Sequence, residues 1–150
     1  MTVREAQEGD EEFILGLVPR FVENGIAGGH TSDEVIAGTS RVLRASLRAR
    51  LPDEVFFIAE DAGGERLGFA YVVTESDFFT GEDYAHVSEI AVARSGNGAG
   101  AAMMDAAEAW ARERGYRFVT LNVVEANGAA QRFYERRGYA VGHRHYVKRF

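Results

Sequence analysis

The chain of 150 residues contains no cysteine. This absence excludes disulfides, thiolate nucleophiles, a cysteine-bound acyl intermediate and cysteine-ligated zinc or iron–sulfur centres. Any chemistry must therefore come from carboxylates, histidines, tyrosines, hydroxyls or backbone groups. A chain without cysteine also fits a reducing compartment, and we expect a cytoplasmic protein. Lysine is equally scarce: none precedes Lys148, which excludes a P-loop, because that motif requires a lysine directly after its second glycine.

Long apolar runs are missing as well. The N-terminus lacks the apolar core of a signal peptide, and no segment approaches the length that spans a bilayer, so we expect no membrane association. Excess positive charge is also absent, because the formal net charge is −6. Nucleic-acid binding relies on concentrated lysine and arginine, so we expect no nucleic-acid partner and mildly favour cationic ones.

What the chain does contain is 46% hydrophobic residues, enough for the core of one domain covering residues 1–150. Hydrophobic periodicity and turn residues predict helices after Asp10 to about residue 24, after Ser32 to about 50, from about 98 to 115, and over 127–137. The same patterns predict strands at 2–5, 55–60, 66–73, 86–92, 118–124, 139–141 and 146–150, with a surface loop at 74–84. The order β-α-α-β-β-β-α-β-α-β-β indicates an α/β protein of the α+β kind with a mixed sheet.

A glycine-rich turn, Gly96-Asn97-Gly98-Ala99-Gly100, joins the strand at 86–92 to the following helix. Free backbone N–H groups and the helix dipole make such a junction attractive to a diphosphate. Glycine lets phosphate oxygens approach the backbone and permits positive φ. The spacing Gly96-x-Gly98-x-x-Ala101 also satisfies a dinucleotide-binding motif, which stays an alternative. Against it, only one further strand–helix unit follows, too little for a doubly wound domain.

A second pattern lies in the last predicted helix. Asn127, Ala130 and Tyr134 are spaced three and four residues apart, which places them on one helix face ahead of Gly138. By itself this spacing is typical of ordinary packing, with the tyrosine as a core aromatic.

Together the two patterns resemble the GNAT superfamily of N-acetyltransferases. The strand and turn of this family correspond here to V-S-E-I-A-V-A-R-S-G-N-G-A-G over residues 87–100, and its N-x-x-A-x-x-x-Y-x-x-x-G-[FY] stretch to residues 127–139. The resemblance implies a GNAT-like fold over the whole chain, with acetyl-coenzyme A as co-substrate. One position departs from the family pattern: Ser95 replaces the usual Gln or Arg of the phosphate loop, which should weaken cofactor binding without abolishing it.

The resemblance also implies roles for individual residues. Asn127 would hydrogen-bond the cofactor near its pantetheine, and Tyr134 would stand near the sulfur as the general acid that protonates the departing thiolate. A strand would offer its main chain to the pantetheine through Ile90, Ala91 and Val92. A loop would hold the diphosphate with Ser95, Gly96, Asn97, Gly98, Ala99, Gly100 and Ala101.

An amine of pKa about 10.4 must lose a proton before it attacks, and Glu89 is the candidate base because many family members carry an acidic residue there. Without cysteine, direct transfer in a ternary complex is expected. The acceptor would be a small-molecule or peptide amine, and acidic residues in the 74–84 loop favour a cationic one. His143 and His145 lack supporting carboxylates, so no metal is assigned. The other alternative function is that of a non-catalytic acyl-coenzyme A sensor. Separately, the apolar C-terminus is compatible with a homodimer.

Overall fold

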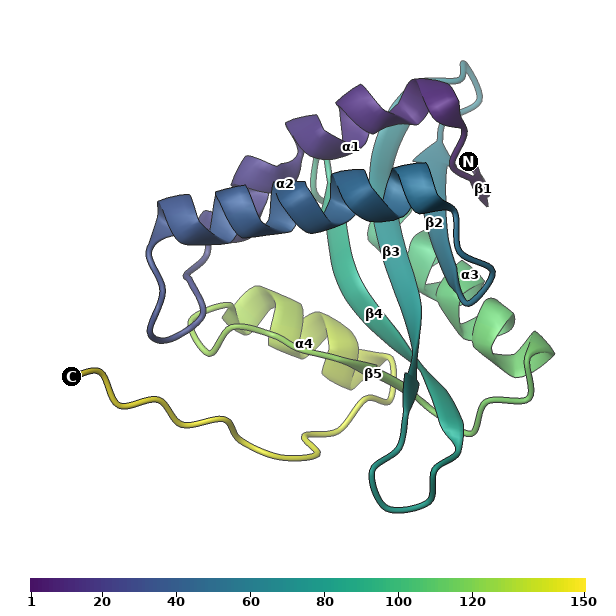
Figure 1. The fold of residues 1–150 in the computed structure, drawn as a ribbon. Helices are drawn as coiled ribbons and strands as arrows, with labels where there is room; N and C mark the ends of the chain where they lie inside the picture. Colours follow the sequence, from purple (N-terminus) through teal and green to yellow (C-terminus); the bar gives the residue numbers. More distant parts are fainter.

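The computed structural model describes all residues, 1–150, and shows one sheet with helices on both faces (Figure 1). The strands are β1 (Thr2–Glu5), β2 (Glu54–Glu60), β3 (Arg66–Ser76), β4 (Asp83–Val92) and β5 (Val119–Leu121). The α-helices are α1 (Glu11–Gly16), α2 (Ser32–Ala49), α3 (Ala99–Glu113) and α4 (Gly128–Arg136), and the 3-10 helices are η1 (Glu8–Asp10) and η2 (Val18–Val22). The mixed α/β class predicted from the sequence is confirmed.

The five strands lie in the order β1-β2-β3-β4-β5. The first four pair antiparallel, and β5 joins β4 in parallel. A bulge interrupts the β3–β4 ladder: Val72 pairs with Val87 and Tyr71 with Glu89, so Ser88 is the extra residue. Because side chains alternate along a strand, the extra residue moves Glu89 to the face opposite to that of Val87.

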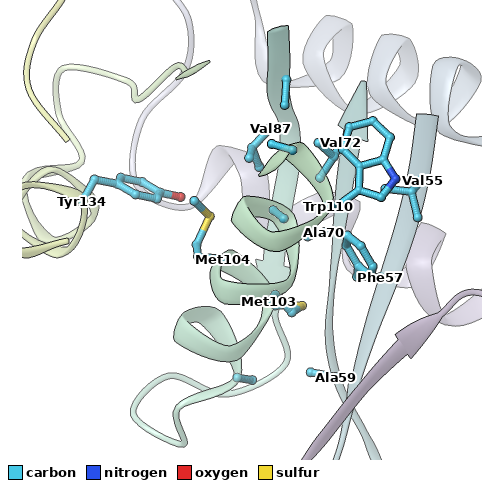
Figure 2. Packing of buried hydrophobic residues seen from close by; sticks show 14 residues of the cluster. Val55, Phe57, Ala59, Ala70, Val72, Val87, Met103, Met104, Trp110 and Tyr134 are labelled. Carbon is cyan, nitrogen blue, oxygen red and sulfur yellow. The ribbon is translucent and has the colours of Figure 1, made fainter. Parts of the chain in front are cut away.

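Two hydrophobic clusters cover the two faces of the sheet. Met103, Met104 and Trp110 of α3 pack with Tyr134 of α4 on one face, and Figure 2 shows the Tyr134 ring reaching toward Met104. Residues of α1, η2 and α2 pack on the other face against Phe56, Ile58, Phe69, Tyr71 and Ala91. The apolar stripes of the helices are thereby removed from water on both sides of one sheet.

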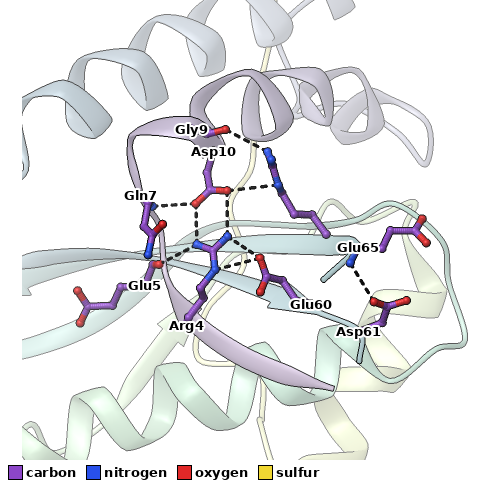
Figure 3. A network of polar contacts seen from close by, with 9 residues as sticks. Arg4, Glu5, Gln7, Gly9, Asp10, Glu60, Asp61 and Glu65 are labelled. Atoms are coloured by element: carbon purple, nitrogen blue, oxygen red, sulfur yellow. Dashed lines mark hydrogen bonds and ion pairs between the residues drawn. The ribbon is translucent and has the colours of Figure 1, made fainter. Parts of the chain in front are cut away.

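A polar network joins the start of the chain to the hairpin between β2 and β3 (Figure 3). The buried carboxylate of Asp10 accepts hydrogen bonds from Arg4 and from the backbone N–H of Gln7, and it forms an ion pair with Arg66. Burial favours the neutral acid, but the bonds from Arg4 and Gln7 outweigh it and hold the pKa of Asp10 below its ordinary value. Asp10 therefore anchors β1 and, although it directly precedes α1, its side chain does not cap that helix.

The first helix is also shorter than predicted. The chain passes from α1 into η2 with Pro19 at its start, because proline cannot donate the backbone hydrogen bond that continues an α-helix. The predicted loop at 74–84 is shorter in the structure: β3 extends to Ser76, β4 begins at Asp83, and residues 77–82 form the turn.

The two predicted C-terminal strands, 139–141 and 146–150, are not formed, and β5 covers only Val119–Leu121 of the predicted 118–124. The backbone N–H of Tyr139 bonds to the carbonyl of Tyr134, and from residue 140 onward no hydrogen bond joins the chain to the rest of the protein. A strand requires a neighbouring backbone as well as strand-forming side chains, and no such backbone is paired with these residues. The mixed sheet consequently ends at β5.

Candidate functional site

The ladder between β4 and β5 ends in the middle of β4. Its last pair is Val87 with Leu121, whereas β4 continues to Val92 with β3 alone as its partner. The main chain of Ile90, Ala91 and Val92 therefore has no strand beside it on this edge, although β5 pairs with β4 at residues 85–87. An opening of this kind lets an extended amide-containing ligand bond to the strand as an added strand would.

The glycine turn follows directly at the end of β4. Gly96 and Gly98 have φ of +84° and +83°, which confirms the positive φ expected at this turn. The Asn97 Oδ1 atom accepts from the backbone N–H of Ala99 at 3.0 Å, and α3 begins at that residue. The N–H groups of Gly100 and Ala101 have no acceptor within the helix, as in any first turn, and remain available to an anion.

Open space around these glycines is consistent with a ligand at the turn. A Cβ added to Gly96 would meet nothing within 4 Å, and one added to Gly100 would lie 3.9 Å from Val92 and from Phe133 of α4. The protein itself therefore does not require glycine at position 100. A small residue there keeps the backbone of the first turn of α3 approachable.

A cavity with a volume of about 500 Å³ adjoins the start of the turn. Its lining includes Asp61 and Glu65 of the β2–β3 hairpin together with Arg94, Ser95 and Asn97. Two carboxylates disfavour a diphosphate in this cavity. The first turn of α3, beside Val92 and Phe133, is chemically better suited to hold that group.

Helix α4 carries the next two predicted site residues. The Asn127 Oδ1 atom accepts from the backbone N–H of Ala130 at 3.1 Å and so caps the helix, which leaves its side-chain N–H₂ free to donate. Tyr134 is buried, and its hydroxyl makes no hydrogen bond with the protein. Burial raises the pKa of Tyr134 to about 12, so the phenol keeps its proton at neutral pH and can donate it.

Glu89, the predicted base, lies on the opposite face of the sheet from Tyr134. It pairs with Tyr71 across the ladder, on the face covered by α1 and α2, and its carboxyl group makes no hydrogen bond. Burial raises the pKa of Glu89 to about 7. A carboxyl group with this pKa is partly ionised at neutral pH, which suits a group that must take a proton from an amine.

Two further side chains make contacts near the open edge of β4. The His86 Nδ1 atom lies 2.7 Å from Thr120 Oγ1 and links β4 to β5 one pair before the end of their ladder. The Arg20 guanidinium reaches from η2 to the carbonyl of Ala93 at 2.5 Å, which ties the helical layer to the end of β4. Arg20 was not predicted as part of the site, because an arginine on a helix carries no sequence signal that distinguishes such a contact from an exposed position.

The acidic residues of the β3–β4 hairpin lie at the other end of β4 from the glycine turn. Their carboxylates bond within the hairpin or to the segment before β5: Glu75 accepts from Tyr84, Asp83 from Ser76, and Glu82 from Arg117. The loop between η2 and α2 instead lies near the opening, since a Cβ on Gly25 would meet Val124 and Ala126, which precede α4. No group of three or more histidine or acidic residues is placed to hold a metal ion. None of the helices combines the length and the apolar character that a membrane-spanning helix requires.

The mixed α/β domain thus has a half-open parallel strand pair, a glycine turn at a helix N-terminus and a tyrosine hydroxyl without a hydrogen bond. Residues 29–139 match the family model described as the acetyltransferase (GNAT) family. The chain therefore belongs to the GNAT acetyltransferase family, as the resemblance of its two motifs implied.

Solved structures agree with this assignment. A proposed acetyl transferase from Pyrococcus furiosus is 26% identical with a TM-score of 0.78, and the match covers 99% of each chain. A ribosomal-protein-alanine N-acetyltransferase from Brucella melitensis has 20% identity, a TM-score of 0.71 and full coverage of both chains. An aminoglycoside 6'-N-acetyltransferase from Acinetobacter haemolyticus has 12% identity and a TM-score of 0.71, over 100% of this chain and 99% of its own. At these lower identities the likeness shows the fold alone. No curated protein matches the sequence.

Proposed function

We propose that the protein transfers an acetyl group from acetyl-coenzyme A directly to a primary amine in a ternary complex. The observation that carries this proposal is the open edge of β4, which has the glycine turn at its end and the unbonded hydroxyl of Tyr134 on one face of the sheet. The amides of Ile90–Val92 would bond to the pantetheine arm. The loop over residues 95–101 would hold the diphosphate, and the free N–H₂ of Asn127 would donate to the pantetheine.

The two ionisable groups suit opposite ends of the reaction. Glu89 would take a proton from the protonated amine, and the neutral nitrogen would attack the thioester carbon. The carbon–sulfur bond would then break as the sulfur receives the proton of Tyr134, and the second proton lost by the nitrogen as it becomes an amide would restore the phenol. An amine that approaches on the α1/α2 face would meet Glu89 first. Partial negative charge on that carboxyl group favours a cationic acceptor, small or peptidic, near the loop between η2 and α2.

The alternatives are weaker. Four of the five strands pair antiparallel, so the chain does not contain the parallel doubly wound sheet that a dinucleotide-binding domain uses. An acyl-coenzyme A sensor would share the binding features and differ only in turnover. A thermal-shift titration with acetyl-coenzyme A, with NAD as competitor, followed by thiol release across a panel of amines, tests the proposal. Absence of any shift with acetyl-coenzyme A would refute it.

The Tyr134→Phe variant separates the enzyme from the sensor. Loss of a general acid should lower kcat by about 10²-fold or more, with little change in the acetyl-coenzyme A affinity. Tyr84→Phe is the matched control, because Tyr84 lies at the far end of β4 and bonds only to Glu75. A Tyr134→Phe protein that releases thiol at the rate of the Tyr84→Phe protein would remove Tyr134 from the mechanism.

A further inference from the structure

Lys148 is the one lysine among the 150 residues of the chain. Arginine guanidinium groups stay protonated and do not accept an acyl group. The chain therefore offers a single side-chain amine that an amine acetyltransferase could modify. Lys148 is exposed, and its ammonium group lies 5.7 Å from the centre of the Phe150 ring, within the same segment. Its nitrogen is thus accessible.

Residues 140–150, the C-terminal segment, begin beside the proposed general acid. The backbone N–H of Tyr139 bonds to the carbonyl of Tyr134 at 3.1 Å, and the two rings lie 5.8 Å apart. From residue 140 onward no hydrogen bond holds the chain to the rest of the protein. Lys148 follows Tyr139 by nine residues, and an extended chain of that length spans up to about 30 Å. The segment is long enough to bring Lys148 back to Tyr134.

An apolar contact places the far part of the segment beside the loop between η2 and α2. An added Cβ on Gly28 or Gly29 would lie 3.5 Å or 3.0 Å from the side chain of Val147, and Figure 1 shows the segment passing this loop. The same loop contacts the residues that precede α4 and so lies near the opening at β4. In the proposed reaction the acceptor amine enters on this side. Lys148, directly after Val147, is therefore held near the acceptor entrance.

Charge and tethering both favour this lysine as an acceptor. The segment has a charge of +3, from Arg144, Lys148 and Arg149, within a chain of net charge −6, so residues 1–139 carry −9. Partial negative charge on Glu89 attracts a cationic group in the same way. An amine on a short tether has an effective concentration of about 1 mM or more, without any binding step of its own.

We propose that the enzyme acetylates the Nζ atom of Lys148 in its own chain, an inference that rests on the proposed transfer to amines. The Nζ ammonium group loses a proton to Glu89, and the neutral nitrogen attacks the thioester carbon of acetyl-coenzyme A. The carbon–sulfur bond breaks as the sulfur takes the proton of Tyr134, and the second proton lost by the nitrogen restores the phenol. The products are Nζ-acetyl-lysine and coenzyme A, and the segment loses one positive charge.

Intact-mass spectrometry of the full chain incubated with acetyl-coenzyme A tests the proposal. Wild type should gain the mass of one acetyl group, mapped to Lys148, with a first-order rate constant that stays constant on about 100-fold dilution of the protein. Lys148→Arg keeps the charge and should gain none. Protein unfolded in urea gives the spontaneous rate, which should be about 10²-fold lower. A folded protein no faster than the unfolded one, a rate that falls with dilution, or an acetyl group on Met1 alone would overturn the proposal.

A pair of valine variants tests the contact that places Lys148. Val147→Asp removes the packing against the loop, whereas Val141→Asp changes a valine that is 75% exposed at the other end of the segment. Relative to thiol release with an external amine, self-acetylation should slow about 10-fold in Val147→Asp and stay near wild type in Val141→Asp. Equal self-acetylation in the two variants contradicts the proposal.

Failure of this inference and failure of the proposed function give different results. Thiol release with an external amine, but no acetyl group on Lys148, refutes self-acetylation and leaves the amine acetyltransferase in place. Absence of both reactions refutes the two together. Acetylation of Lys148 with the dependence on dilution and on Val147 described above supports both.

Discussion

Glu89 places an ionisable group on a sheet face whose neighbouring buried residues are Phe69, Tyr71 and Ala91. The Ser88 bulge is responsible, since it shifts the alternation of β4 by one residue. A carboxyl group held there without a hydrogen bond costs stability when it is ionised. A residue kept in this condition is characteristic of a functional site.

This cost predicts a specific dependence of stability on pH. Burial raises the pKa of Glu89 from 4.5 to about 7, so the folded state holds the proton more tightly than the unfolded state. The contribution of Glu89 to stability is full below pH 4.5, falls as the pH rises toward 7, and levels off above it. Glu89→Gln cannot ionise, so at pH 8 it should unfold with a free energy up to about 3 kcal/mol above wild type.

Urea unfolding at pH 4 and pH 8 measures this difference, with the exposed Glu12→Gln as control. Thiol release at pH 8 should move the other way and fall by about 10²-fold in Glu89→Gln, because the base is lost. The prediction fails if the free energies of unfolding of wild type and Glu89→Gln change by the same amount between the two pH values. A rise in stability with a loss of activity would distinguish a functional carboxylate from a structural one.

At the scale of the element, α4 combines a helix cap with a proposed cofactor contact in the single residue Asn127. Its Oδ1 atom stabilises the helix and its N–H₂ is free. Asn127→Asp keeps the accepting oxygen and loses the donor, so we expect near-normal stability with about 10-fold weaker acetyl-coenzyme A binding. Asn127→Ala loses both and should also cost about 1 kcal/mol. Thermal melts report the effect on stability, and calorimetric titration reports the effect on acetyl-coenzyme A affinity. If Asn127→Asp and wild type bind the cofactor equally well, Asn127 serves only as the helix cap.

The elements that were predicted correctly are those whose pattern is local. Met103, Ala107 and Trp110 recur at helical spacing and lie buried in α3, and the glycines at 96 and 98 have the positive φ that the turn requires. The Ser88 bulge was not predictable, because it arises from the register between β3 and β4, and simple alternation would have placed Glu89 beside Val87. The C-terminal strands were wrong for a related reason. Strand-forming residues such as Tyr146 do not reveal whether a partner backbone lies beside them.

At the scale of the whole molecule, one sheet joins two hydrophobic clusters into a single folding unit. α3 and α4 cover one face and α1 with α2 the other, so neither helical layer touches the apolar side chains of the opposite layer except through the strands. The candidate site depends on both layers, because Tyr134 belongs to one and Glu89 to the other. If the two layers unfold only together, Tyr134 and Glu89 keep a fixed relative position for as long as the protein is folded.

The single tryptophan, Trp110, lies in the α3 layer, whereas the fully buried Leu43 of α2 lies in the other. Leu43→Ala should destabilise the protein by about 2–5 kcal/mol through the cavity it leaves. If the sheet couples the layers, Trp110 fluorescence should report the full loss, with a urea midpoint equal to that from far-UV circular dichroism. Leu51→Ala, at a leucine that is 52% exposed, is the matched control and should change stability by less than about 1 kcal/mol. A Leu43→Ala protein whose helical signal melts before its fluorescence would show instead that α1 and α2 unfold as a separate unit, so that Glu89 could lose its cover while Tyr134 stays in place.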